Sequence, residues 1–209
     1  MERYSLLKYK DRRNTNSVKW DDLEEKFGRT DLLPAWVADM DIEAPECVRE
    51  ALTEYVNYNV YGYYSIPESF TDSFIQWMKE RHGYEINPLW IRYSPGVVPA
   101  IYWIIQMLTE IEDSVALMSP VYYPFANAIR DTSRTLVDVP LVKDENGYYT
   151  MDLENFEATV QKKDVKLFIL CYPAVIRWAE YGARRSFGIY WMCVDGMGST
   201  SLRMRFTTI

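Results

Sequence analysis

The chain has 209 residues, of which 48% are hydrophobic and 25% are charged, a balance typical of a globular domain. The formal net charge of -7 argues against nucleic acid as a partner, because a phosphate backbone is bound by positive charge. No segment reaches the roughly 20 apolar residues of a membrane span, and the N-terminus has no signal-peptide pattern. We therefore expect a cytoplasmic protein without a membrane partner.

The cysteines and the histidine do not form a metal-binding pattern. Cys47, Cys171 and Cys193 are odd in number and widely spaced, and His82 is the one histidine. This set fits neither a zinc site nor a disulfide framework, so we expect no metal. His82 precedes Gly83 at the expected end of a helix, which favours a structural role there over catalysis.

The first elements form a polar start followed by an apolar loop. A short helix is expected over residues 21–27, and it would end at Gly28. Residues 31–41 (Asp-Leu-Leu-Pro-Ala-Trp-Val-Ala-Asp-Met-Asp) have no helical period and predict a loop that ends in two acids. By spacing alone, a linker with Trp36 packed in the core is favoured over a loop that lines a site.

Two amphipathic helices are expected next. In residues 44–56 apolar side chains recur at helical spacing, which predicts a helix with one face buried. A tyrosine-rich loop follows over residues 58–65. The pattern of residues 67–81 predicts a second helix, with these side chains in the core: Phe70, Phe74, Trp77 and Met78.

The segment Tyr-Ser-Pro-Gly-Val-Val-Pro-Ala over residues 93–100 predicts a turn into a helix. An extended stretch over 91–94 is expected to be a strand that breaks at Pro95 and Gly96. A helix follows, with these apolar residues on one face: Ile101, Ile104, Ile105 and Leu108. The first turn of a helix has unpaired N–H groups and positive partial charge, so it could hold a phosphate. A single turn of this kind is common in α/β proteins and is weak by itself.

Strands and helices alternate in the remainder of the chain. Buried strands are expected over 115–119, 135–142 and 166–171, with helices over 122–130 and 153–160. The inward side chains of the second helix are expected to be Leu153, Phe156 and Val160. This order predicts an α/β domain with a mostly parallel sheet and flanking helices. Ligands of such a sheet gather at the carboxyl ends of its strands.

Three segments carry a resemblance to a known family. They are the loop over 31–41, Tyr61-Gly62-Tyr63, and Ser-Pro-Val-Tyr-Tyr-Pro-Phe over 119–125. Together they resemble fold-type I pyridoxal-phosphate (PLP) enzymes, most closely the cystathionine β-lyase-like C–S lyases of the class I/II aminotransferase superfamily. The resemblance runs from about Trp20 to Cys171. It implies a PLP-dependent transferase fold, with residues 1–45 as the N-terminal arm and part of the small domain, and 46–171 as the N-terminal half of the large domain.

The resemblance implies a cofactor site. The backbone N–H groups of Gly96, Val97 and Val98 would bind the PLP phosphate, and Tyr122 would lie against the pyridine ring. The family builds each site across a homodimer interface, so Tyr63 would donate its hydroxyl to the phosphate in the neighbouring subunit. Without the resemblance, both tyrosines would be interpreted as ordinary packing.

The same resemblance implies the substrate. Trp36 and Ala38 would lie near the carboxylate of an amino acid that carries sulfur on its β-carbon. Cleavage would give a thiol, ammonia and pyruvate, with PLP as the electron sink, and transamination would compete from the same chemistry.

The family pattern stops after Cys171. The expected Asn-Pro loop, the Asp for the pyridine nitrogen and the Schiff-base lysine are absent, and Lys162, Lys163 and Lys166 lie on an expected surface turn. The coding bases can be regrouped so that each new codon takes the third base of one codon and the first two bases of the next. In this frame, residues 175–182 permit Asn-Pro-Val-Gly-Arg-Val-Trp. Residues 196–209 permit His-Gly-Val-His-Val-Ile-Ser-Asp-Glu-Ile-His-His-Asp. These are the next two family motifs in order. We therefore interpret residues 172–209 as an out-of-frame tail after a frameshift between about 173 and 175.

The sequence thus predicts a truncated PLP-dependent C–S β-lyase. Without the lysine it has no catalytic residue, so we expect weak PLP affinity and no useful turnover. Two alternatives stay within the family: a fragment of a PLP-dependent aminotransferase, and a non-catalytic interaction or regulatory remnant that keeps the dimerising part. A third is an unrelated small α/β binding protein whose loops match by accident.

Overall fold

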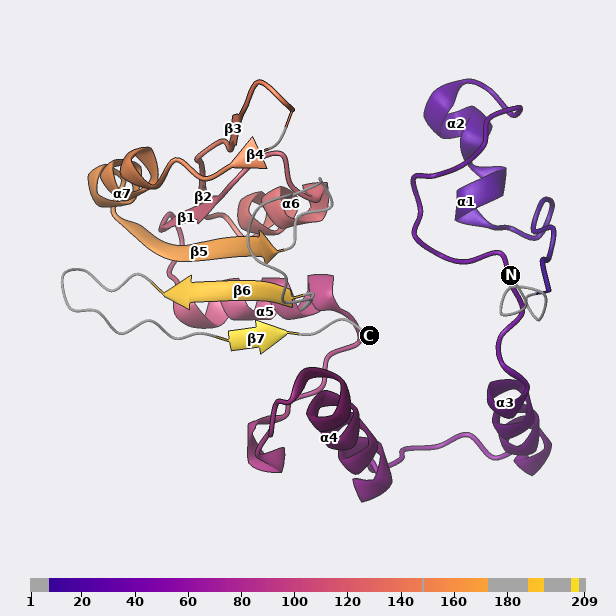
Figure 1. Cartoon of the computed structure of the whole chain (residues 1–209). Helices are drawn as coiled ribbons and strands as arrows, with labels where there is room; N and C mark the ends of the chain where they lie inside the picture. The colour runs from indigo at the N-terminus through magenta and orange to yellow at the C-terminus, as the bar shows by residue number, and fades with distance from the viewer. Residues whose placement is uncertain (1–7, 148, 173–187, 194–203, 207–209) are drawn as a thin grey trace. The chain divides into compact units, whose positions relative to one another are not determined.

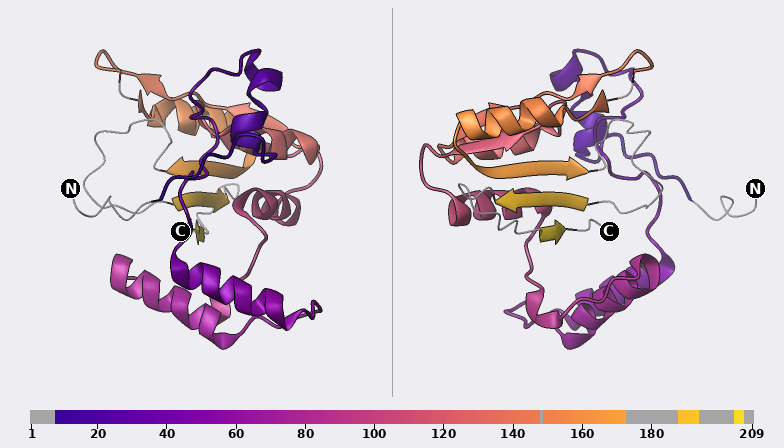
Figure 2. Two further views of the ribbon diagram at one scale, coloured as in Figure 1. Left: turned by 90° about the vertical axis from the view of Figure 1, so that its right-hand side faces the viewer. Right: turned by 60° about the vertical axis from the view of Figure 1, so that its left-hand side comes forward.

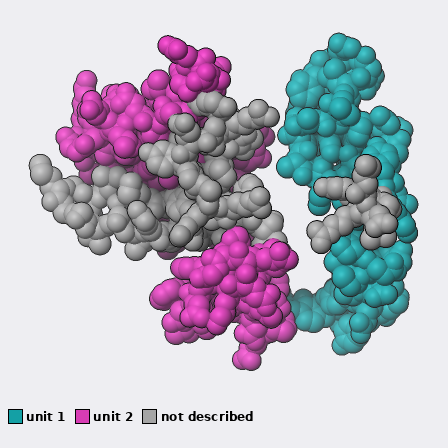
Figure 3. All heavy atoms as spheres, in the orientation of Figure 1, with its two compact units in different colours: residues 1–65 teal, residues 66–209 magenta. Residues whose placement is uncertain are grey.

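The computed structural model describes residues 8–147, 149–172, 188–193 and 204–206. The chain divides into two compact units, Met1–Ser65 and Ile66–Ile209, which are coloured separately in Figure 3 and are described here one at a time. The predicted boundary between residues 45 and 46 stays a prediction. No helix among the described residues is long and apolar enough to cross a membrane.

The first unit begins with two short helices, α1 (Val18–Asp21) and α2 (Leu23–Phe27). Trp20 and Leu23 are buried between them and the neighbouring loop. Gly28 ends α2 in the left-handed region, at φ 69°, and its N–H donates to Glu24 O at 2.8 Å. Glycine adopts this conformation without steric cost, so the predicted end of the helix at Gly28 is confirmed.

Helix α3 (Glu46–Tyr58) follows the expected period, but the expected burial of its apolar face is wrong. No residue of α3 is buried within the described part of the chain, and Leu52 is 61% exposed. Helical spacing shows that a face is apolar, whereas burial also needs a second surface to cover it.

The second unit begins with α4 (Glu68–His82) and a short 3-10 helix, η2 (Pro88–Trp90). Of the four side chains predicted for the core, only Met78 is buried. Phe70 and Trp77 are exposed, so that part of the prediction is wrong; the guanidinium of Arg81 lies over the Trp77 ring at 4.8 Å. Gly83 ends α4 at φ 61°, as expected from its place after His82.

The main sheet has the strand order β2-β1-β5-β6-β7 and can be followed in Figure 1. Its strands are β1 (Ser114–Leu117), β2 (Thr135–Asp138), β5 (Val165–Tyr172), β6 (Gly188–Cys193) and β7 (Met204–Phe206). The first three pair in parallel, whereas β6 and β7 are antiparallel to their neighbours. A separate antiparallel pair joins β3 (Val142–Lys143) to β4 (Tyr149–Thr150).

Helices α5 (Val97–Leu108), α6 (Tyr123–Asp131) and α7 (Leu153–Lys162) flank this sheet, as the two views of Figure 2 show. Side chains alternate across β1: Val115 and Leu117 join a core cluster with α5 and α6, whereas Ala116 joins a second cluster with Val160 of α7. Successive residues of a strand point to opposite faces, so β1 is buried on both. The expected α/β class with flanking helices is confirmed.

Two local predictions in this unit are wrong. Residues 91–94 belong to no strand in the part of the chain that the structure describes, so they are a connection there and not part of the sheet. In α7, Phe156 packs its ring against Phe168 at 4.7 Å and Val160 is buried, but Leu153 is exposed at the first turn. Extended residues become a strand only when a neighbour supplies the hydrogen-bond ladder.

Strands β6 and β7 fall in residues 172–209, the segment that the coding-frame comparison assigns to a tail. The rest of that segment, residues 173–187, 194–203 and 207–209, lies outside the described residues. The prediction of an out-of-frame tail is therefore untested by the fold.

Candidate functional site

The start of α5 has the geometry of an anion site. Helix α5 begins at Val97, after Gly96, and no side chain caps its first turn. The amides of Val97 and Val98 lie in that first turn, where a helix offers no acceptor of its own. Ser94 shapes the turn, because its hydroxyl donates to Gly96 O at 2.7 Å, and Gly96 O also accepts from the amide of Ala100 at 3.2 Å.

Gly96 leaves the outer side of this turn bare. Its φ of 170° and ψ of 169° are extended, so the backbone itself does not demand glycine. A Cβ placed there would meet only Pro99 Cδ, at 3.6 Å, which is an ordinary contact. The protein would therefore tolerate a methyl group here, and the open space is available for a group that approaches the backbone, as a phosphate does.

Tyr122 is the N-terminal flanking residue of α6, just after β1 and its loop. Its ring contacts the rings of Tyr123 at 5.3 Å and Phe125 at 5.7 Å, both edge-on, and the residue remains 48% exposed. Phe125 belongs to the same core cluster against which Val97 packs. The structure thus sets the start of α5 and the start of α6 against one core, and Tyr122 keeps part of its surface open to a planar partner.

The remaining predicted site residues lie in the first unit. Trp36 is half-exposed, its ring lies edge-on to Phe27 at 5.5 Å, and its indole N–H donates to Lys19 O at 3.1 Å. Ala38 is exposed, and Tyr63 is fully exposed. The interpretation of residues 31–41 as a loop is confirmed, whereas Trp36 is not in the core. The roles predicted for Trp36, Ala38 and Tyr63 stay predictions.

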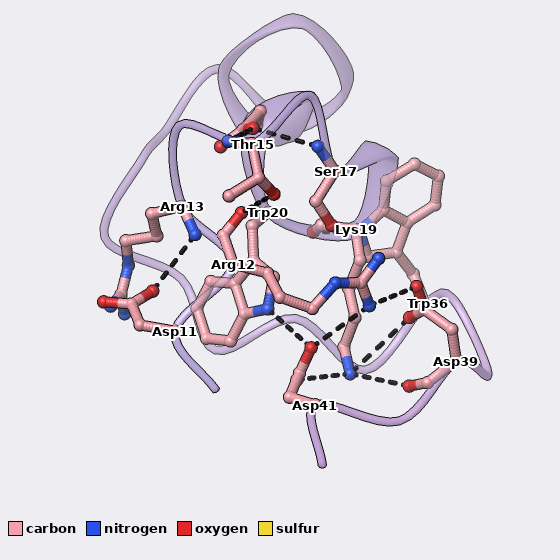
Figure 4. Close-up of polar contacts among 11 residues, drawn as sticks. Asp11, Arg12, Arg13, Thr15, Ser17, Lys19, Trp20, Trp36, Asp39 and Asp41 are labelled. Atoms are coloured by element: carbon pink, nitrogen blue, oxygen red, sulfur yellow. Dashed lines mark hydrogen bonds and ion pairs between the residues drawn. The ribbon is translucent and has the colours of Figure 1, made fainter. Parts of the chain in front are cut away.

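A polar cluster supports this loop and was missed by the sequence analysis (Figure 4). We call it the clasp; it consists of Arg12, Lys19, Trp20, Asp39 and Asp41. The ammonium of Lys19 donates to Asp41 Oδ2 at 2.7 Å and to Asp39 O at 2.9 Å. The two acids that end the loop were the available signal, but their partners lie about twenty residues earlier in the chain.

The charges of the clasp are closely matched. Asp41 Oδ1 accepts from the indole N–H of Trp20 at 3.0 Å and from Arg12 at 3.3 Å. The pKa of the Asp41 carboxyl is lowered by its three partners. The hydrogen bond from Lys19 has the largest effect, and Trp20 and Arg12 add to it. Asp39 accepts from Arg12 at 2.5 Å, and this bond raises the pKa of the guanidinium. A carboxylate with such partners stays ionised, so its negative charge is a fixed structural element.

Among the residues that the structure describes, no group of three or more His, Cys, Asp or Glu side chains could hold a metal ion.

Residues 37–174 match the family model described as aminotransferase class I and II. The chain belongs to this family. Its members include PLP-dependent enzymes, and the bare helix turn at Gly96 lies within the matched residues.

Two curated relatives match most of this chain. The chain is 42% identical over 166 residues to cystathionine β-lyase PatB of Bacillus subtilis, and 30% identical over 171 residues to protein MalY of Escherichia coli. The alignments cover 79% and 81% of this chain but only 43% and 44% of those proteins. The chain thus spans less than half the length of the curated relatives it matches.

The fold is also that of this class I and II aminotransferase family. The structure of cystalysin from Treponema denticola, which contains a pyridoxal 5'-phosphate cofactor, is similar with a TM-score of 0.72 and 32% sequence identity. The similarity covers 80% of this chain and 43% of cystalysin. The PLP-dependent transferase fold expected from the sequence is therefore confirmed over the part of it that this chain contains.

Proposed function

We propose that this chain carries the phosphate-binding part of a PLP-dependent C–S β-lyase of the cystathionine β-lyase type. Such an enzyme cleaves an amino acid that has sulfur on its β-carbon into a thiol, ammonia and pyruvate. The observation that carries the proposal is the uncapped, sterically open first turn of α5 at Gly96. The likeness to cystathionine β-lyase PatB supports the choice of reaction.

Each predicted site residue has a role in this proposal. The amides of Gly96, Val97 and Val98 hold the cofactor phosphate, because the helix start supplies donors and positive partial charge. The exposed part of the Tyr122 ring covers the flat pyridine ring. When bound, PLP takes up the electron pair left on the substrate when its α-proton is removed.

Residues of the first unit are assigned to substrate binding and to the contact with a second subunit. Trp36 and Ala38 lie beside the substrate carboxylate, and Tyr63 donates its hydroxyl to a phosphate in the neighbouring subunit of a homodimer. The full exposure of Tyr63 supports this role, since its hydroxyl is accessible to a second chain.

We infer that the chain binds PLP weakly and gives no useful turnover. Residues 167–209 contain no lysine, and a lysine amine is the group that exchanges with the substrate and moves its proton in enzymes of this class. The family match ends at residue 174, and this supports a change of reading frame between about residues 173 and 175. Cleavage would then belong to the uninterrupted form of the enzyme.

Transamination is the second candidate, because the matching family model is that of class I and II aminotransferases. Both reactions need the same phosphate turn and the same lysine. The absence of that lysine also favours a non-catalytic role, in which the chain acts as an interaction or regulatory remnant of the enzyme.

The proposed phosphate site is tested by replacing Gly96 with alanine in the full chain. Pyridoxamine 5'-phosphate binding is measured by fluorescence titration, with pyridoxamine, which lacks the phosphate, as the matched ligand. We expect Gly96→Ala to raise the dissociation constant of pyridoxamine 5'-phosphate by about tenfold or more, the scale of one charge-assisted hydrogen bond. The thermal unfolding of the chain should be unchanged. Equal affinity of the wild-type chain for both ligands would contradict the proposal.

A further inference from the structure

We propose that Lys19 and Asp41 are positioning residues for the loop over residues 31–41, which we call the substrate loop. They fix the backbone of Ala38 for contact with the substrate carboxylate. The inference rests on the proposed function and adds the N-terminal arm, residues 8–21, to its machinery. The relevant feature is that one residue of the arm holds the loop at two points.

Lys19 anchors the loop on both sides of Ala38. Its backbone oxygen accepts the indole N–H of Trp36 at 3.1 Å, and its ammonium donates to Asp39 O at 2.9 Å. Ala38 lies between these two anchors in the chain. Any change in the position of Lys19 therefore moves both ends of the short segment 36–39.

Asp41 holds Lys19 in place. The ammonium and the carboxylate are 2.7 Å apart, and their side chains are only 11% and 12% exposed. Removing two charges from water costs free energy that the ion pair only partly recovers, so an apolar pair of the same size would stabilise the fold as well or better. Directional hydrogen bonds, in contrast, select one geometry. The buried pair is thus better suited to fixing a position than to adding stability.

The arm and the loop are also joined through the backbone. Lys10 N donates to Asp41 O at 2.9 Å and Glu43 N donates to Lys8 O at 2.8 Å, around the bridge between Tyr9 and Ile42. Arg12 adds hydrogen bonds to Asp39 and Asp41 from the same arm. Ala38 and Asp39 themselves are exposed, so hydrogen bonds to the arm, and not burial of these two residues, hold this part of the loop.

The test compares two ligands on the full chain. N-(5'-phosphopyridoxyl)-L-alanine carries the amino-acid carboxylate, and pyridoxamine 5'-phosphate lacks it, so the ratio of their dissociation constants measures recognition of the carboxylate part. We expect the wild-type chain to prefer the first ligand. Lys19→Met should reduce that preference by about tenfold, the scale of one lost hydrogen bond to a charged group, and leave pyridoxamine 5'-phosphate binding unchanged.

Two further variants complete the design. Arg12→Gln leaves the Lys19–Asp41 pair intact and should reduce the preference less than Lys19→Met does, so it tests the clasp even if Lys19→Met does not fold. Lys26→Met is the matched control: it removes an exposed pair with Glu25, of 3.6 Å, in the same unit but outside the loop, and should keep the wild-type ratio.

The outcomes separate the inference from the proposed function. If neither ligand binds the wild-type chain, the proposed function fails and the inference with it. If pyridoxamine 5'-phosphate binds but the clasp variants keep the wild-type ratio, the phosphate site stands and the inference is wrong. An equal loss of both ligands in Lys19→Met would show a general structural role and would also overturn it.

Discussion

At the scale of single residues, Asp41 makes the first unit sensitive to acid. Its carboxylate accepts hydrogen bonds from Lys19, Trp20 and Arg12, and the pKa of this group lies below its usual value of 3.8. Because the folded state binds the proton less well than the unfolded state, the clasp contributes its full stability above pH 3.8. That contribution is lost as the pH falls through the lower pKa of the folded state.

An acid titration followed by NMR checks this prediction. The indole N–H resonance of Trp20 reports on Asp41 directly, since Asp41 Oδ1 is its acceptor. We expect the midpoint of the movement of this resonance to lie below pH 3.8. In Asp41→Asn this transition should disappear; a wild-type transition centred at or above the ordinary pKa of aspartate would contradict the assignment.

At the scale of elements, α5 has two faces with opposite roles. Ile105 is fully buried in the cluster shared with α6 and the sheet, whereas Met107, two residues later, is 79% exposed. The hydroxyl of Tyr102 also donates to Asp131 at 2.5 Å and joins α5 to the end of α6. The helix is therefore held by its buried face, and its first turn is free to serve a ligand.

Truncating the buried face should destabilise the second unit. For Ile105→Ala we expect a loss of about 2–5 kcal/mol in the free energy of unfolding, because a cavity replaces well-packed methyl groups. Urea denaturation followed by circular dichroism measures it. Met107→Ala in the same helix is the control, with an expected change of less than about 0.5 kcal/mol. Similar losses in both variants would mean that α5 is not seated on the sheet as described.

The elements also show where sequence patterns were insufficient. Apolar spacing correctly placed Ile101 and Ile105 in the core, because a sheet lies against that face of α5. The same kind of pattern gave a wrong result for Phe70 and Trp77 in α4, which are exposed. Periodicity reports the chemistry of a face, and burial depends on which distant surface meets it.

At the scale of the whole molecule, the chain corresponds to less than half of its curated relatives. The family match ends at residue 174, and regrouping the bases of the later codons permits the two later motifs. We expect sequencing of the gene and its transcript across codons 166–209 to find that a change of one or two bases restores Asn-Pro-Val-Gly-Arg-Val-Trp. An unchanged reading on independent DNA would contradict the frameshift.

The sequence by itself determined the local features of this protein. Gly28 and Gly83 ended their helices as expected, the alternation of strands and helices gave the α/β class, and the loop motifs gave the family. These features depend on backbone preferences and on residues close together in the chain. The tertiary structure alone decided that α3 is exposed and that Lys19 pairs with Asp41, because burial and ion pairing are set by groups that folding brings together from distant positions.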